Sequence, residues 1–295
     1  AEQIVVAMRD RGLPVEYMLA PDEGHGYQRP VNNMAMFMAA EKFFAQQLDG
    51  RYQDGGTPEV VARLKDLMVD PKTVVISKPI EAAAGGAPKP GELHAGTWKY
   101  QMKILLGGQE IALTRSTTIT ATADGFTAVD SVDTPAGAVT DTATLDKATL
   151  ALRHRAVQQG PANVTLDFSG DKATGTIDMG GKQTPISVDL GGALFADGPG
   201  APQIIASLPL AEGYTTTFRN LDLQKQKSKL MQLKVVASES VTVPAGTFDT
   251  YKVEVSDENS GKMTLWIAKE TRSAVKTSAA LPELGGAQVT AELGQ

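Results

Sequence analysis

The chain has 295 residues, of which 42% are hydrophobic and 21% charged, a composition typical of folded globular proteins with room for two domains. Its formal net charge of -6 gives no general attraction for nucleic acid, so we expect no nucleic-acid partner. No run approaches the roughly 20 apolar residues of a membrane-spanning helix, and the absence of cysteine excludes disulfides and thiolate catalysis.

The first 48 residues alternate helical and extended patterns. Residues 1–11 read as a helix ended by the Gly12–Pro14 stop signal, and residues 15–20 as a strand. A second helix is predicted over about 30–48 from apolar residues at helical spacing: Met34, Phe37, Met38, Phe44 and Leu48. We expect the methionines of this helix, Met36 included, to pack in a core.

A third helix is predicted from Thr57 to about Met68, because Thr57 supplies a capping hydroxyl and Pro58 suits a first turn. An extended piece, 73–77, follows. So few strands cannot form a stable sheet, so residues 1–77 resemble the last layer of a sheet whose other strands are absent. Since helical periodicity already begins at Ala1, with neither initiator methionine nor signal peptide, we expect the sequence to be a fragment of a longer protein.

Residues 78–96 are rich in alanine, glycine and proline and are predicted to be a linker. From residue 97 to 295 the hydrophobic period changes to two, as in the runs 99–104, 164–168, 251–255, 263–268 and 287–293. Turn signals separate such runs, at 123–125, 179–181 and 244–246. We therefore predict an antiparallel β domain over 97–295, built as a curved sheet, sandwich or half-barrel, without long helices.

The most informative motif is Glu23-Gly24-His25-Gly26-Tyr27, between the predicted strand and the second helix. Two glycines keep bulk away from the imidazole and permit unusual backbone angles, which is a common way to present a histidine to a nucleophile. The chain contains no Gly-x-Ser-x-Gly elbow that would supply a serine nucleophile.

The run 11–17, the Glu23–Tyr27 motif and the residues Asn32, Glu41, Phe44 and Leu48 together resemble the C-terminal end of the prolyl oligopeptidase family of serine peptidases. The resemblance implies an α/β-hydrolase domain, of which residues 1–77 would be the C-terminal part, and a peptide substrate. It also implies that His25 is the general base, after a serine and an aspartate earlier in the chain order. Neither of these can be assigned here, because loop neighbours such as Asp22 and Glu23 rarely point at the far ring nitrogen. We expect this polypeptide alone to be inactive.

The β half is similar to poorly characterised bacterial domains of cell-envelope proteins, through the runs 243–248, 251–253, 265–268 and 289–293. This resemblance favours a periplasmic or secreted protein. It leaves open an alternative function, in which the β domain binds an apolar ligand or serves as a structural envelope module without catalysis.

The remaining candidate residues favour structural roles. His94 is expected to be exposed in the linker, and His154 to be a partly buried strand residue in phase with Leu150 and Leu152. The three histidines lack metal-ligand spacing, so we predict no zinc site, no other metal and no cofactor. Turns or solvent-facing strand positions are predicted for five aspartates, two glycine-rich pieces and a basic run: Asp141, Asp146, Asp167, Asp171, Asp178, Gly191–Gly192, Gly198–Gly200 and Lys225–Lys229.

Overall fold

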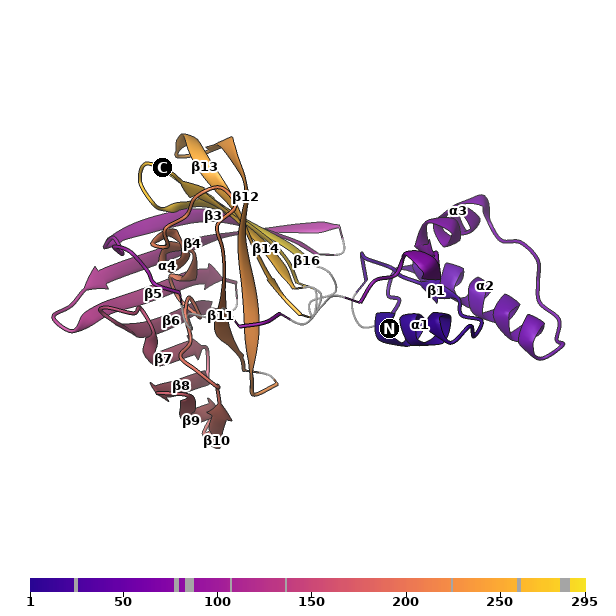
Figure 1. Cartoon of the computed structure of the whole chain (residues 1–295), viewed down its shortest axis with the longest axis horizontal. Coiled ribbons are helices and arrows are strands. Elements are labelled where there is room, and N and C mark those ends of the chain that lie inside the picture. Colours follow the sequence, from indigo (N-terminus) through magenta and orange to yellow (C-terminus); the bar gives the residue numbers. More distant parts are fainter. Residues whose placement is uncertain are drawn as a thin grey trace. The chain divides into compact units, whose positions relative to one another are not determined.

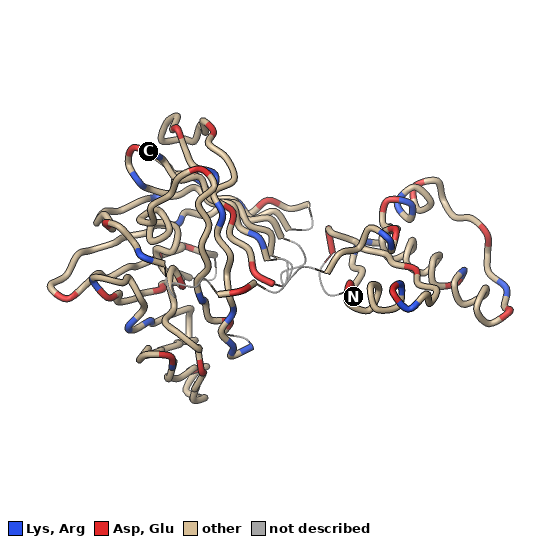
Figure 2. The backbone as a smooth tube through the Cα atoms, in the orientation of Figure 1, with Lys and Arg blue, Asp and Glu red and all other residues tan. Residues whose placement is uncertain are grey.

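The computed structural model describes residues 1–23, 26–76, 80–82, 88–106, 108–135, 137–223, 225–258, 261–281 and 287–295. It divides into two compact units (Figure 1): an N-terminal unit, Ala1–Lys78, and a β domain that contains Pro79–Ala280 and Gln288–Gln295. Basic and acidic residues are interspersed along both units (Figure 2).

The N-terminal unit combines helices with a very small sheet. Its elements in chain order are α1 (Glu2–Asp10), β1 (Tyr17–Met18), α2 (Pro30–Gln47), α3 (Pro58–Leu67), β2 (Met68–Val69) and the 3₁₀ turn η1 (Pro71–Thr73). The three predicted helices are confirmed, including the Thr57 cap, whose Oγ1 accepts a hydrogen bond from the Val60 N–H at 3.4 Å.

The extended segments were predicted less well. The strand expected over 15–20 is reduced to β1, which pairs antiparallel with β2. Met68, expected to end the third helix, instead begins β2, and Thr73, expected to be extended, lies in η1. Both differences arise because the chain turns back after α3 to pair with β1, a tertiary contact without a local signal.

The apolar stripe of α2 faces solvent within this unit, contrary to the prediction of core packing. Phe37, Phe44 and Leu48 are 61%, 58% and 74% exposed, and Met34 is 57% exposed. The buried positions of α2 are instead Asn32, Ala35 and Ala45. Of the predicted core methionines, Met38 does pack against the small cluster formed by Ala35, Val60 and Leu67.

The β domain is built mainly of one large antiparallel sheet, so the prediction of an antiparallel β domain is confirmed. Its strands are β3 (Gly96–Leu106), β4 (Gln109–Ala121), β5 (Gly125–Thr134), β6 (Gly137–Asp146), β7 (Leu152–Gln159), β8 (Ala162–Ser169), β9 (Lys172–Met179), β10 (Lys182–Asp189), β11 (Thr215–Asp222), β12 (Lys227–Val243), β13 (Gly246–Asp257), β14 (Lys262–Ala268), β15 (Ala274–Leu281) and β16 (Ala287–Leu293). All five alternating runs lie within strands, and each of the three turn signals lies where one strand ends and the next begins.

The strand order is β10-β9-β8-β7-β6-β5-β4-β3-β16-β15-β14-β13-β12-β11, so nearly every strand pairs with its sequence neighbours. The β3–β16 pair joins strands from the two ends of the described β domain, and it sets Tyr100 opposite Leu293. The sheet is strongly curved (Figure 1). Its two edge strands, β10 and β11, are consecutive in the chain and are joined by residues 190–214.

This connection contains a short helix, α4 (Ala201–Ala206), which lies in the hollow of the curved sheet (Figure 1). Residues 190–210 are called the plug below, because most of their apolar side chains are buried in the main core. Ile204, Ile205 and Leu208 are at most 1% exposed there. The core also includes Leu93, so part of the predicted linker 78–96 packs into the β domain.

The glycine-rich piece Gly198–Gly200 was predicted to be a turn, and Pro199 and Gly200 do lie in one. Gly200 is in addition the N-cap residue of the short helix α4. A Cβ at Gly200 would lie 3.2 Å from the Ala128 Cβ and 3.3 Å from the Ile119 Cδ1. Gly200 also has a φ of +69°, a conformation that glycine adopts without strain. Glycine here therefore lets the plug backbone lie directly on the sheet.

A buried hydrogen-bond group fastens α4 to the sheet. The Tyr100 hydroxyl donates to the Ala274 carbonyl at 2.8 Å and accepts from Gln203 Nε2 at 2.6 Å. Gln203 Oε1 in turn accepts from the Ala274 N–H at 3.0 Å. Burial raises the pKa of Tyr100 well above its ordinary value, so the hydroxyl keeps its proton for donation.

Replacing Tyr100 by phenylalanine should destabilise the β domain by about 1–3 kcal/mol, because it leaves buried polar groups of Gln203 and Ala274 without a partner. Both tryptophans, Trp98 and Trp266, lie in the β domain, so their fluorescence during urea denaturation reports on this unit. Tyr251→Phe is the matched control, since the Tyr251 hydroxyl makes no hydrogen bond within the described residues. Equal midpoints for the two variants would contradict the fastening role.

Candidate functional site

The loop that carries the Glu23–Tyr27 motif is held in place by polar contacts on both sides of its centre. Gly24 and His25 lie outside the described residues, so the position of the predicted base His25 stays a prediction. Asp22 and Glu23 precede them, and Gly26, with a φ of +88°, follows. The fixed ends of this loop are what the structure shows of the candidate site.

Glu23 folds the loop back onto the start of α2. Its Oε1 accepts hydrogen bonds from the Arg29 N–H and from Asn32 Nδ2, both at 2.8 Å, and its Oε2 accepts from the Gln28 N–H at 3.1 Å. The carboxylate thus satisfies backbone donors just before the first turn of α2, where negative charge is favoured.

Asp22 serves a second set of partners. It forms ion pairs with Arg63 of α3 and, at 3.3 Å, with Arg29. Arg63 Nε also donates to Oδ1 of the fully buried Asn32 at 2.6 Å. The loop, α2 and α3 are therefore tied together through Asn32, and both acidic neighbours of the histidine are engaged in holding the loop.

The hydrogen bonds at Glu23 shift its titration. Partial burial raises the pKa of Glu23, but the bonds from Arg29, Asn32 and Gln28 outweigh it and leave the pKa below its usual value. A carboxyl group with a depressed folded pKa contributes stability above its unfolded pKa and loses it as the pH falls through the folded pKa. The loop should therefore loosen only in acid.

We expect Glu23→Gln to lower the hydrogen-exchange protection of the Gln28 and Arg29 amides about tenfold at neutral pH, because bonds to a charged acceptor are replaced by weaker ones. The difference should shrink below the ordinary glutamate range, where the wild-type carboxyl group is protonated too. Glu59→Gln, on the exposed first turn of α3, is the control. Protection that is unchanged in Glu23→Gln would rule out the anchoring role of Glu23.

Beside this loop the N-terminal unit has an unpaired strand edge. The Leu19 N–H donates to the Leu67 carbonyl at 2.8 Å, and Tyr17 pairs with Val69, so these residues direct their backbone groups toward β2. Because backbone groups alternate sides along a strand, those of Glu16 and Met18 point the other way. In the described part of the chain no strand pairs with that edge.

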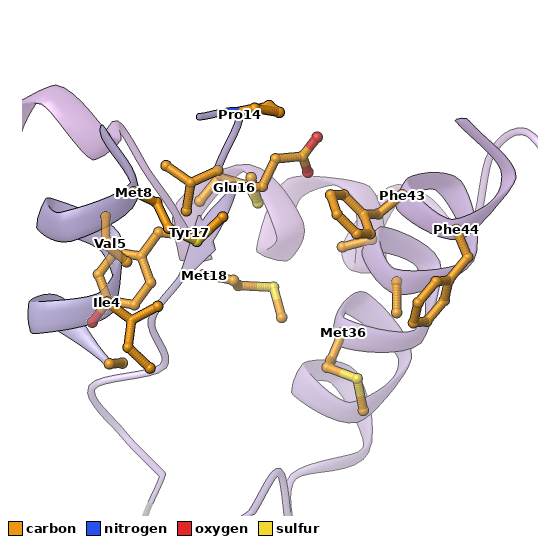
Figure 3. Close-up of a pocket in the computed structure, with 15 residues that line it drawn as sticks. Ile4, Val5, Met8, Pro14, Glu16, Tyr17, Met18, Met36, Phe43 and Phe44 are labelled. Carbon is orange, nitrogen blue, oxygen red and sulfur yellow. The ribbon is translucent and has the colours of Figure 1, made fainter. Parts of the chain in front are cut away.

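A slot of about 480 Å³ adjoins β1 (Figure 3). Residues of α1 line one side of the slot and residues of α2 the other, with Tyr17 and Met18 between them. Its lining is almost wholly apolar: Ile4, Val5, Met8, Met18, Met36, Phe43 and Phe44 are among the residues that form it. The slot has the apolar walls and the free backbone edge that a further strand would require.

A second polar group, missed in the sequence, lies inside the β domain. Arg155 of β7 makes a bidentate contact with Asp141 of β6, with Nη2–Oδ2 at 2.7 Å and Nε–Oδ1 at 3.1 Å. Its Nη1 lies 3.3 Å from Oδ1 of Asp197, a plug residue whose Oδ2 accepts the Leu221 N–H at 2.7 Å. Asp197 thus connects the plug both to β7 and to the edge strand β11.

Burial raises the pKa of Asp197, against the opposing effect of the Arg155 charge. Burial likewise raises the pKa of the neighbouring Asp130, which is opposed by Arg115 and by a hydrogen bond from the Thr117 hydroxyl. Three largely buried carboxylates therefore have their negative charge balanced by two guanidinium groups, those of Arg155 and Arg115. This group holds the plug in place. Asp141 was predicted to lie in a turn or on a solvent face, and this is wrong, because its side chain is largely buried against Arg155.

A bulge explains why this group escaped the sequence. The β6–β7 register shifts between Thr144 and Leu145, so that Leu152 and Arg155, three residues apart, both face inward. His154 is partly buried, as predicted, but on the outer face, where its Nδ1 lies 2.7 Å from Asp167 Oδ1. The alternation that placed it in phase with Leu152 is broken by the bulge.

The other candidate residues have structural surroundings. His94 is exposed. Asp146 and Asp178 accept hydrogen bonds from turn N–H groups, as expected for turn residues. Within the described ranges, no group of three or more acidic and histidine side chains is arranged to hold a metal ion, and no helix is long and apolar enough to cross a membrane.

Replacing Arg155 by methionine should destabilise the β domain by about 3 kcal/mol at neutral pH, because two carboxylates lose their buried cation. The adjacent Arg153 is 51% exposed and pairs with Asp146 at the surface, so Arg153→Met should cost about 1 kcal/mol or less. Urea denaturation followed by tryptophan fluorescence compares the two.

The pH dependence of the Arg155→Met cost has a definite sign. A carboxyl group whose folded pKa is raised destabilises the folded state when the pH rises above its unfolded pKa. The cost of Arg155→Met should therefore be smaller in mild acid than at neutral pH, since Asp197 is then protonated. If the loss of unfolding free energy caused by Arg155→Met grew in acid, it would not arise from carboxylates that have lost their cation.

Short segments of two peptidases are similar to this chain. Over 56 residues it is 50% identical to dipeptidyl aminopeptidase BIII of Pseudoxanthomonas mexicana, which is 19% of this chain and 8% of that protein. Over 53 residues it is 42% identical to dipeptidyl peptidase family member 6 of Caenorhabditis elegans, which is 18% of this chain and 7% of that protein. The chain thus spans less than a tenth of the length of either relative.

Two solved structures are similar over most of this chain at low identity. One is a β-barrel-like protein of a domain of unknown function, DUF1849, from Brucella abortus, with a TM-score of 0.40, 8% identity, and coverage of 71% of this chain and 98% of that chain. The other is the hypothetical lipoprotein YmcC of Escherichia coli, with a TM-score of 0.28, 8% identity, and coverage of 67% and 84%.

The model of one protein family matches residues 90–292, which is more than half of the chain and takes in nearly all of the large sheet. The chain therefore belongs to the family described as proteins of unknown function, DUF3108.

Proposed function

We propose that the N-terminal unit is the C-terminal end of a prolyl-oligopeptidase-like catalytic domain, joined to a DUF3108 β domain. The parent enzyme hydrolyses peptide bonds by acyl transfer, with His25 as the general base and a peptide as the substrate. The reaction needs no metal and no cofactor.

The observation that carries this proposal is that the N-terminal unit is unfinished. Among its described residues no strand pairs with the outer edge of β1, an apolar slot of about 480 Å³ adjoins that edge, and an apolar stripe on α2 faces solvent. A unit that folds by itself would bury such surfaces, because exposed apolar patches of this kind mark contacts with further protein. A larger sheet flanked by α1 and α2 would cover all three.

The similarity to the two dipeptidyl peptidases supports the same reading. The family model accounts for residues 90–292, which leaves the preceding part of the chain as the natural place for a 56-residue match. Those relatives are named for releasing dipeptides, which agrees with a peptide as substrate for the parent enzyme.

The catalytic roles can be divided. Asp22 and Glu23 are engaged with arginine, asparagine and backbone N–H partners, so neither is free to orient the histidine. The orienting acid and the serine must then come from a part of the parent domain outside residues 1–295. We accordingly expect the 295-residue polypeptide to be inactive by itself.

A chimera tests His25. The matching 56-residue stretch of the Pseudoxanthomonas mexicana enzyme is replaced by the stretch from this chain, and hydrolysis of a dipeptide ester and amide is measured. The chimera should be active, and His25→Ala should lower its kcat at least about 10³-fold. Gln28→Ala, an exposed position of the same loop, is the control.

Each result of this experiment bears on the proposal. Activity that survives His25→Ala would show that His25 is not the base. A folded chimera that is inactive with His25 present would show that the two stretches are not equivalent, which removes the support from similarity.

The alternative, a ligand-binding or structural β-domain protein, is constrained by the plug. Ile204, Ile205 and Leu208 fill the hollow of the sheet that an apolar ligand would otherwise occupy. A ligand of the β domain would have to bind outside the main core. The resemblance of this half to envelope proteins favours the periplasm or the cell exterior as its location.

A further inference from the structure

The seam between the two edges of the large sheet contains Arg219, which has no acidic partner among the described residues. The plug leaves β10 at Leu190 and reaches β11, where Leu194 bridges to Arg219 and the Phe195 N–H donates to the Arg219 carbonyl at 3.1 Å. Two cavities of about 210 and 500 Å³ lie along this seam, and both are lined by Gly191 and Arg219.

The plug backbone lies directly beside the Arg219 guanidinium. A Cβ at Gly191 would be 3.6 Å from Arg219 Cζ, and one at Gly192 would be 3.3 Å from Arg219 Nε. Gly191, with a φ of +63°, and Gly192, with +150°, also have backbone conformations that side chains rarely adopt. No plug side chain therefore covers the guanidinium at these two positions.

Arg219 has spare hydrogen-bonding capacity. A guanidinium carries five N–H donors, yet the side-chain bond found for Arg219 is a long one, from Nη1 to Ser228 Oγ at 3.4 Å. Among the described residues no carboxylate lies within ion-pair distance of Arg219. Arg155 of the same domain differs from Arg219 in this respect, because its guanidinium pairs with two carboxylates.

The larger cavity adds groups that suit an anion. Lys227, which makes no ion pair within the described ranges, lines it together with Ser187 and Ser228. The one carboxylate there, that of Asp189, accepts the Gly191 N–H at 3.1 Å and so holds the plug turn. Phe218 and Leu230 are among the residues that line the smaller cavity and supply apolar surface for a ligand.

We propose that this seam, called the Arg219 site, binds a carboxylate or phosphate group of a small molecule or lipid headgroup. Arg219 supplies planar, bidentate recognition of the anion, and Lys227 and Ser228 complete its contacts. The proposal concerns the β domain alone and does not depend on the proposed function of the N-terminal unit.

The test is a titration of the ¹⁵N-labelled full chain with inorganic phosphate and, separately, with acetate at constant ionic strength, followed by NMR. We expect saturable shifts of the Arg219 Nε–H and of the Gly191 and Gly192 amides. Arg219→Gln should weaken binding at least about tenfold, since a charge-assisted bidentate contact is lost. Lys182→Gln, the same charge change on β10 but outside both cavities, should leave affinity unchanged.

Vesicles then distinguish the two sources of the anion. Binding to phosphatidylglycerol vesicles, but not to phosphatidylcholine vesicles, that requires Arg219 would identify a lipid headgroup. Phosphate or acetate binding without vesicle binding would identify a small soluble anion.

The proposal is overturned if neither anion shifts the Arg219 and Gly191–Gly192 signals, or if Arg219→Gln and Lys182→Gln respond alike. Should Arg219→Gln fail to fold, as judged by tryptophan fluorescence, Lys227→Gln replaces it and should bind several-fold more weakly. The map of shifts in the wild-type chain decides the location of the site in either case.

Discussion

The β domain depends on covering one apolar face of a long curved sheet. Because β3 pairs with β16, the edges of this sheet are the mid-chain strands β10 and β11, and free edges invite pairing with other chains. The connection between those two strands solves both problems, because residues 190–210 fill the hollow and also bridge to β11. The plug therefore covers the apolar face and also pairs with the β11 edge through Leu194 and Phe195.

The polar contacts of the plug give it one position. Apolar contacts alone are non-directional, whereas Gln203 with Tyr100, and Asp197 with Arg155, each have a single geometry that satisfies them. Buried ion pairs add little net stability, but breaking one is costly. The Asp197–Arg155 pair therefore favours one arrangement of residues 190–210 over the alternatives. It does so because any arrangement that buries Asp197 without a cation is strongly destabilised, even though the pair itself adds little stability.

The sequence predicted the elements better than their contacts. Period-two alternation and turn residues identify strands because both are local, and the Thr57–Pro58 cap likewise identified α3. The plug escaped prediction because six residues are too few for helical periodicity, and Arg155 because one bulge reverses the inward and outward alternation. On α2 the stripe was identified, but it faces solvent in the described N-terminal unit, because α2 packs on α3 through Asn32 and Ala35 instead.

The two units consequently differ in how much of their own apolar surface they bury. The β domain fills its own core with the plug, while the N-terminal unit exposes Phe37, Phe44 and Leu48 and has a strand edge with which no described strand pairs. A short unit buries too little apolar area to offset the entropy of ordering its chain. If a larger sheet supplied the missing contacts, as we propose, the exposed apolar face of α2 and the histidine loop would have one explanation, because both would belong to the same catalytic domain.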